Sequence, residues 1–120
     1  MTRFRNAIAV VAMAFLSCND AGLCENSAQV EIPSPDQRLG AWVFIRGCGA
    51  TTKNSVHVTV LPAGSPPPAD AGNTFAREPV SAVRVEWSSK DQLLITHQRG
   101  GNVFKQESEV AGVAVSYRLE

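Results

Sequence analysis

Residues 82–97 read Ala-Val-Arg-Val-Glu-Trp-Ser-Ser-Lys-Asp-Gln-Leu-Leu-Ile-Thr-His, and this stretch decides the fold class. Val83, Val85 and Trp87 alternate with Arg84 and Glu86, which is the period-two pattern of a strand with one buried face. Ser-Ser-Lys-Asp at 88–91 is typical of a turn, and an apolar, β-rich segment follows it at 92–97. The stretch therefore predicts a β-hairpin.

Three further segments have strand character. Residues 38–46 form an apolar run after the turn sequence Ser-Pro-Asp-Gln at 34–37, and residues 55–61 and 113–118 alternate between apolar and polar positions. After residue 17, no segment keeps a 3.6-residue apolar period over three turns. We expect a mainly β protein, with one small antiparallel sheet of about five main strands, curled or shaped like a single propeller blade.

Both faces of this sheet carry apolar side chains, because Val43 and Ile45 alternate with Trp42 and Phe44. The second face must be covered by curling of the sheet, by a loop or by another chain. Residues 62–79 form a long Pro-rich loop, with three consecutive prolines at 66–68, that cannot pair within a sheet. We expect a curled sheet with this loop as its lid.

The N-terminus has the pattern of an export signal. Arg3 and Arg5 precede an unbroken apolar run at 7–16, which matches the basic start and the core of about 7–15 residues of a secretory signal. Phe-Leu-Ser-Cys at 15–18 resembles a bacterial lipobox and predicts lipidation of Cys18. Cleavage after Ala21, or a retained N-terminal helix, are the alternatives. We expect a helical signal segment at 1–17, a tether at 18–33 and a small antiparallel β domain at 34–120.

The remaining cysteines form a natural pair. If Cys18 takes the lipid, Cys24 and Cys48 are left in an oxidising compartment, where disulfides persist. We expect a disulfide between them, with Cα atoms about 4.4–6.8 Å apart. Two free thiols are the alternative. Two cysteines and two distant histidines do not supply a zinc site, and we expect no cofactor.

The charge balance argues against a nucleic-acid partner. The 120 residues contain 11 basic and 11 acidic side chains, and removal of residues 1–17 takes away two of the basic ones. The exported chain then has nine basic and eleven acidic side chains, a net charge of −2. It has no basic stripe, whereas nucleic-acid binding depends on clustered Lys and Arg.

One turn is a candidate binding site. Two glycines in the segment 46–55 permit backbone geometries that direct N–H groups to one side, and two cations flank them, so the turn could hold a phosphate, carboxylate or sulfate. The alternative is a disulfide-anchored connection between two strands, with glycines there for conformational reasons. The candidate residues are Arg46, Gly47, Gly49, Thr51, Thr52 and Lys53.

His57 and His97 are the two candidates for acid–base chemistry, and each lies on a predicted strand. No Ser, His and acid grouping has a diagnostic local motif, so we expect no catalytic residues. The enzyme alternative would pair one of these histidines with an acid, and it requires a hydrogen bond to an acid or hydroxyl in a concave pocket. The candidate acids are Asp36, Asp91 and Glu86.

Taken together, these segments resemble a group of small exported bacterial proteins, lipoproteins among them, whose function is unknown. Cys-Gly-Ala-Thr-Thr at 48–52 is the most specific part of the resemblance. Gln37-Arg38 replaces the usual Gly-Lys, and Gly47 stands where an acidic residue is common. The resemblance implies export, bacterial origin and a small β domain, and it implies no activity. It rests on residues 24–26, 34–36, 43–44, 46, 48–52, 72–75, 83–87, 103–104, 112–113 and 117.

These features predict a binding or interaction module attached to the cell envelope through an N-terminal lipid, or secreted if cleavage follows Ala21. Its partner would be an envelope protein or a small anionic ligand. A small secreted enzyme and a structural accessory protein are the alternatives.

Overall fold

The computed structural model describes residues 24–50 and 52–120, and this part of the chain is all β. The predicted signal segment, Cys18, the cleavage site after Ala21 and Thr51 lie outside the described residues. The described part contains no helix with the length and apolarity of a membrane span. Its strands are β1 (Glu25–Pro33), β2 (Leu39–Gly47), β3 (Ser55–Pro62), β4 (Phe75–Glu78), β5 (Val83–Ser89), β6 (Gln92–His97), β7 (Asn102–Gln106), β8 (Glu109–Val110) and β9 (Val113–Leu119).

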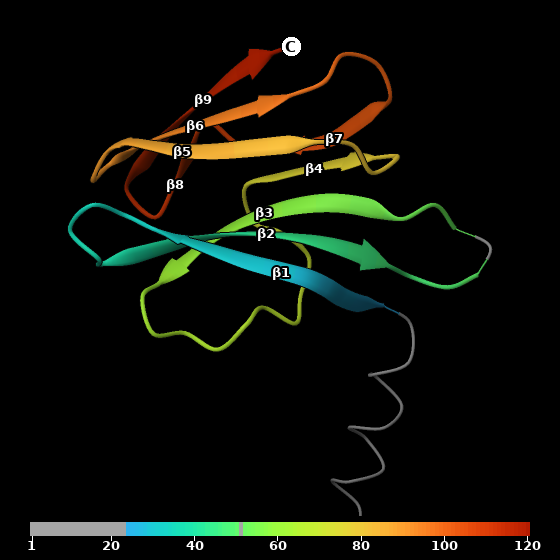
Figure 1. Ribbon diagram of the computed structural model, residues 1–120, viewed down its shortest axis with the longest axis horizontal. Coiled ribbons are helices and arrows are strands. Elements are labelled where there is room, and N and C mark those ends of the chain that lie inside the picture. Colours follow the sequence, from blue (N-terminus) through green and yellow to red (C-terminus); the bar gives the residue numbers. More distant parts are fainter. Residues whose placement is uncertain (1–23, 51) are drawn as a thin grey trace, which may run out of the picture.

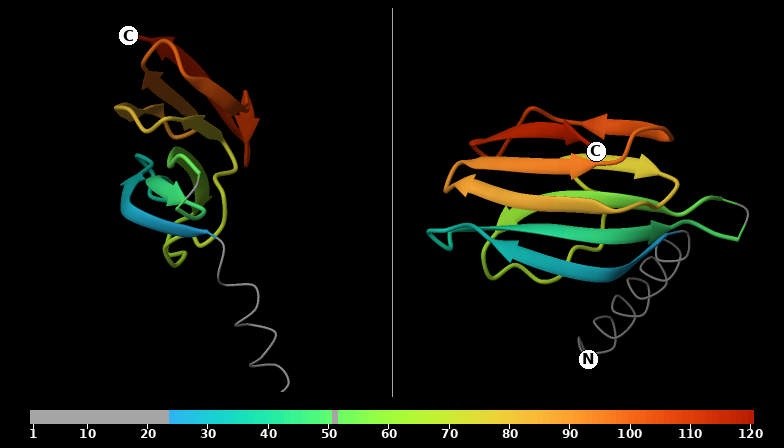
Figure 2. Two further views of the ribbon diagram at one scale, coloured as in Figure 1. Left: turned by 90° about the vertical axis from the view of Figure 1, so that its right-hand side faces the viewer. Right: turned by 45° about the horizontal axis from the view of Figure 1, so that its top comes forward.

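The expected antiparallel sheet of five strands is present, in the order β1-β2-β3-β4-β7. A second sheet, in the order β5-β6-β9-β8, contains the predicted hairpin (β5 and β6) and the predicted last strand (β9). The hairpin is confirmed, with Val83 opposite His97 and Val85 opposite Ile95. Figure 1 shows β5 and β6 lying over β1, β2 and β3, and the two further views in Figure 2 show the same two layers.

The strands are thus divided between two sheets, and one pair is parallel. After β6 the chain crosses to the first sheet, where β7 pairs with β4, and it returns through β8 to lie parallel to β6 as β9. Periodicity indicates that a strand has one apolar face, but it does not specify the partner across which that face is buried.

One hydrophobic core lies between the two sheets. One apolar face of each predicted strand points into it, including Val58 and Val60 of β3 and Ile95 of β6. Phe75 of β4 is fully buried there, although the sequence suggested a loop at this position. The core consists of Leu39, Ala41, Val58, Val60, Phe75, Val85, Leu93, Ile95, Val113 and Val115.

The tether expected at 18–33 is shorter than predicted. Residues Glu25–Pro33 form β1, which pairs antiparallel with β2 at the edge of the five-stranded sheet. Trp87 donates its indole N–H to the Ile32 carbonyl (2.8 Å), which fastens β1 to the second sheet as well. The part of the chain that could act as a tether therefore ends near Cys24.

The predicted disulfide joins Cys24 to Cys48. The pairing of Glu25 with Gly47 continues by one residue, so the two cysteines lie directly opposite each other at the ends of β1 and β2. Their Cα atoms are 3.9 Å apart, which is shorter than expected. The disulfide closes the end of the strand pair from which the N-terminal segment leaves the domain.

Candidate functional site

The outer face of the five-stranded sheet, which points away from the core, is largely covered by the loop between β3 and β4. Trp42, Phe44 and His57 are buried on this face. The loop is held against it by hydrogen bonds, among them Asn73 N–H to Thr59 Oγ1 (3.1 Å) and Gly72 N–H to His57 Nδ1 (2.9 Å). The expected role of the Pro-rich loop as a lid is confirmed.

Arg46 fastens this lid to the strands beneath it. Its Nη1 donates to Asn26 Oδ1 (2.8 Å) and to the Ala69 carbonyl (3.2 Å). Asn26 in turn donates through Nδ2 to the carbonyls of Pro68 and Asp70, each at 2.9 Å. The guanidinium thus joins β1, β2 and the loop, and this role was not predicted from the sequence.

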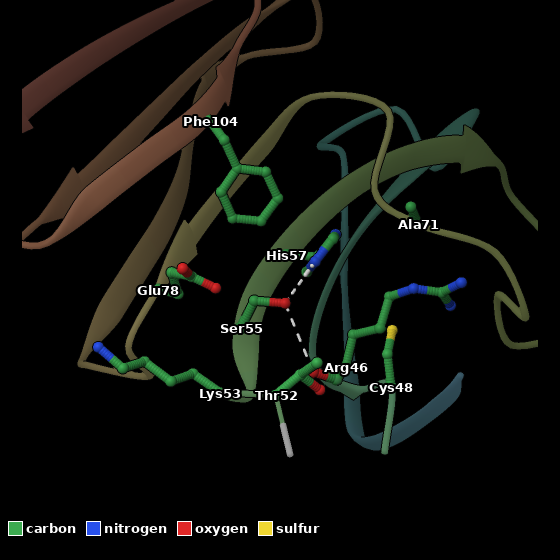
Figure 3. A pocket seen from close by; sticks show the side chains of 9 residues that line it. All are labelled: Arg46, Cys48, Thr52, Lys53, Ser55, His57, Ala71, Glu78 and Phe104. Atoms are coloured by element: carbon green, nitrogen blue, oxygen red, sulfur yellow. Dashed lines mark hydrogen bonds between the residues drawn. The ribbon is translucent and has the colours of Figure 1, made fainter. Parts of the chain in front are cut away.

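The lid leaves one end of the outer face uncovered, and a pocket of about 330 Å³ lies there. Figure 3 shows Lys53 and Arg46 on opposite sides of it, with Ser55 and His57 between them and Phe104 above. Three residues of the predicted binding turn line this pocket. The complete lining is Arg46, Cys48, Thr52, Lys53, Ser55, His57, Ala71, Glu78 and Phe104.

The predicted turn contributes side chains to this site rather than a cradle of backbone N–H groups. Thr52 directs both its N–H and its hydroxyl to the Gly49 carbonyl, at 3.4 and 3.2 Å, inside the turn itself. Gly47 and Gly49 are not part of the pocket lining. Gly49 has a φ of 122°, a conformation that favours glycine.

Phe104 reaches the pocket because β7 carries a bulge. Ala76 of β4 lies opposite Lys105, whereas Arg77 lies opposite Val103, so Phe104 has no partner of its own. Such a bulge redirects a side chain relative to the regular alternation of a strand. The Phe104 ring meets the His57 ring edge-on at 5.8 Å between centroids, and the side chain is 51% exposed.

The backbone of the lid determines the tautomer of His57. An amide N–H can only donate, so the bond from Gly72 N–H makes Nδ1 an acceptor and places the ring proton on Nε2. The Nε2–H then donates to Ser55 Oγ (2.8 Å). A Cβ at Gly72 would lie 2.6 Å from the Val58 carbonyl oxygen, so only glycine allows the lid to approach β3 this closely.

His57 is held in its neutral form. Burial is the largest cause that lowers its pKa from 6.5 to about 4, and the positive charges of Arg46 and Lys105 lower it further. Two cations, Arg46 and Lys53, and one acid, Glu78, line the pocket. The lining therefore has a net charge of +1 around a neutral imidazole.

The other candidate acid–base residues lie apart from this pocket. His97 is buried against Phe75, with 4.8 Å between ring centroids. The hydrogen bonds and ion pairs of the described residues join neither histidine to a carboxylate. Asp36 is held by Ser34 and Arg38, Asp91 by Ser89, and Glu86 by Arg84.

Two patterns in the sequence point to lining residues that were not predicted. Ser55 stands two positions before His57 on a strand, so the two share a face. Residues 72–75 and 100–104 each run from glycine through asparagine to phenylalanine, and the structure places the strands β4 and β7 side by side. Phe75 enters the core and Phe104 the pocket, a difference that comes from the bulge.

The described residues contain no group of three or more His, Cys, Asp or Glu side chains placed to hold a metal ion. No family model, no curated protein and no solved structure matches this chain.

Proposed function

We propose that this protein is a binding module of the bacterial cell envelope, attached by a lipid on Cys18, and that its pocket takes a small anionic ligand. The observation that carries the ligand part is the placement of Lys53 and Arg46 on opposite sides of one concave site. Lys53 has no hydrogen bond or ion pair to any other described residue, so its ammonium is free to meet a ligand. Ser55 is a second donor, because its bond to the Arg46 carbonyl is long, at 3.4 Å, and can be exchanged.

The Ser55–His57 pair is the specific observation that favours an enzyme. In a serine nucleophile pair, however, the imidazole accepts the hydroxyl proton. Here Nε2–H donates a hydrogen bond to Ser55. Nδ1, which an orienting acid would have to contact, accepts a hydrogen bond from the Gly72 N–H instead. The direction of both bonds supports a binding module over a hydrolase.

The disulfide supports attachment close to the site. Cys48 lines the pocket, and its partner Cys24 begins the described chain. Cys24 is six positions after Cys18, and this segment spans at most on the order of 20 Å when fully extended. A lipid on Cys18 would therefore keep the pocket near the membrane surface, whereas cleavage after Ala21 would release the protein.

The lipid attachment predicts that Cys18→Ala abolishes labelling by radioactive palmitate in bacterial cells and leaves the precursor uncleaved or cut at another site. Cys24→Ala is the matched control, because it removes a neighbouring cysteine and should keep the label. Equal labelling of the Cys18→Ala protein and the wild type would overturn the lipoprotein proposal.

The ligand proposal predicts that Lys53→Ala weakens anion binding about five- to tenfold, because a charge-assisted hydrogen bond is lost at a partly enclosed site. NMR titration of the oxidised domain with propionate, 3-phenylpropionate and inorganic phosphate measures this effect through the amide shifts of residues around the pocket. Lys90→Ala, in the turn between β5 and β6, is the control and should bind as the wild type does.

Saturable shifts confined to the pocket support the proposal. Failure of all three anions to produce them, or equal affinity of the Lys53→Ala and wild-type proteins, would contradict it. Melting temperatures of both variants show that the domain is intact, since each substituted lysine is exposed.

A further inference from the structure

We infer that the ligand of this pocket is a small monoanion with an aromatic group, of the arylalkyl carboxylate class. This inference rests on the proposed anion-binding function and adds the chemistry of the rest of the ligand. It depends on the position of one exposed phenylalanine, on the charge of the lining and on the size of the pocket.

Phe104 lines the site with an exposed apolar side chain that is not part of the hydrophobic core. It is one of four large hydrophobic side chains that are exposed in the described residues, and it lies at the mouth of the pocket. Phe44 and His57 stack beneath it with 5.5 Å between centroids, and both are buried. The row of rings therefore ends in an aromatic face that is open to a ligand.

The ring row is built across the sheet by a small residue. Ala76 of β4 lies between His57 and β7 in the register of the sheet. Its methyl group leaves room for the Phe104 ring to contact His57 across the intervening strand. Aromatic rings prefer edge-to-face or offset contacts with one another, so an aryl group is the ligand component that extends this row.

The charges of the site select an anion of low charge. The lining itself has two cations and one acid, a net charge of +1, and Lys105 acts on His57 from outside this lining. A monoanion balances the net charge of +1, whereas a dianion would leave an uncompensated charge against the apolar surfaces of Phe104 and Ala71. A carboxylate also matches the donors available from Lys53 and Ser55.

The size of the pocket is consistent with this class. A volume of about 330 Å³ is at the lower end of the range of small-molecule sites. It accommodates one ring with a short acidic chain. Phe104 and Ala71 are apolar side chains of its lining, and Cys48 adds the disulfide.

The test compares four probes on the oxidised domain by NMR titration or calorimetry: 3-phenylpropionate, 3-cyclohexylpropionate, propionate and 3-phenylpropylamine. We expect 3-phenylpropionate to bind at least tenfold more tightly than propionate and more tightly than its cyclohexyl analogue. Phe104→Ala should lower the affinity for 3-phenylpropionate about tenfold and that for propionate much less. Phe104→Leu should bind both ring-bearing acids equally.

The control is Val30→Ala, which removes another exposed apolar side chain, on β1, and should bind all probes as the wild type does. If propionate binds as tightly as 3-phenylpropionate, the aromatic class is wrong while the anion-binding function stands. If 3-phenylpropylamine binds most tightly, through Phe104 and Glu78, both the ligand class and the anion-binding function are wrong. If none of these probes binds, the aromatic class is wrong, and if inorganic phosphate also fails to bind, the anion-binding function is wrong as well.

Discussion

Removal of the Cys24–Cys48 disulfide is expected to lower the free energy of unfolding by about 3.5 kcal/mol. The cross-link joins residues 24 apart in the sequence, and the chain-entropy model gives this value for a loop of that length. Small domains have a total stability of about 5–15 kcal/mol. The loss would therefore be a large share of the total stability. The disulfide holds one end of β1, which is an edge strand.

Urea denaturation of the Cys24→Ser/Cys48→Ser protein measures this loss against the oxidised wild type. The double substitution leaves neither cysteine of the pair as a free thiol, and the wild type in reducing agent serves as its control. The double-serine variant and the reduced wild type should unfold at the same urea concentration, well below that of the oxidised protein. Coincident curves with and without reductant would show that the cross-link contributes nothing.

The second large effect is a loss of stability in mild acid that originates at His57. The folded state lowers the pKa of this buried imidazole from 6.5 to about 4. Between these two pH values the unfolded chain binds a proton at this position and the folded chain does not. Stability is therefore fully present above pH 6.5 and falls as the pH decreases toward 4, by about 3 kcal/mol in total.

The measurement is the free energy of unfolding from pH 7.5 to 4, compared between the wild type and His57→Phe. Phenylalanine keeps the stacking on Phe44 but cannot take up a proton. The free energy of unfolding should therefore change less with pH in the variant than in the wild type between pH 7.5 and 4. Asp36 has little influence on this comparison, because its pKa is lowered from 3.8 to about 2, first by the Ser34 hydroxyl, so most of its effect lies below pH 4, and both proteins contain it.

An NMR titration of the His57 ring provides a measurement that does not depend on how well the variant folds. The ring resonances of the wild type should show no titration above pH 5. A midpoint near 6.5, or identical slopes of stability with pH in the two proteins, would contradict the assignment of His57 as a neutral, buried group.

The strands with strong alternation of apolar and polar residues could be predicted from the sequence. The hairpin at 82–97 and the strand at 55–61 depend on local side-chain patterns, and the burial of Val58, Val85 and Ile95 follows from them. The sequence did not indicate β1 or β4 as strands. β1 has nine residues, but it is an edge strand in which none is buried, so it shows no apolar period. β4 has only four residues inside a Pro-rich segment, which is too short to show one.

The site divides in the same way. Arg46, Thr52 and Lys53 could be selected from the sequence because glycines, cations and a cysteine occur together in one short segment. Ala71, Glu78 and Phe104 could not, since they come from a loop and two strands that lie far from that segment in the chain. A pocket is a property of surfaces that meet, and local patterns do not report which surfaces meet.

The amino-acid sequence by itself determined the all-β class, the pairing of Cys24 with Cys48 and the inward face of each strongly alternating strand, because each depends on residue type and short-range spacing. The tertiary structure decided the division into two sheets, the tautomer of His57 and the exposure of Phe104. Each of these depends on a long-range contact: the crossing of β7 to β4, the approach of Gly72 to His57, and a bulge that is defined only against a partner strand.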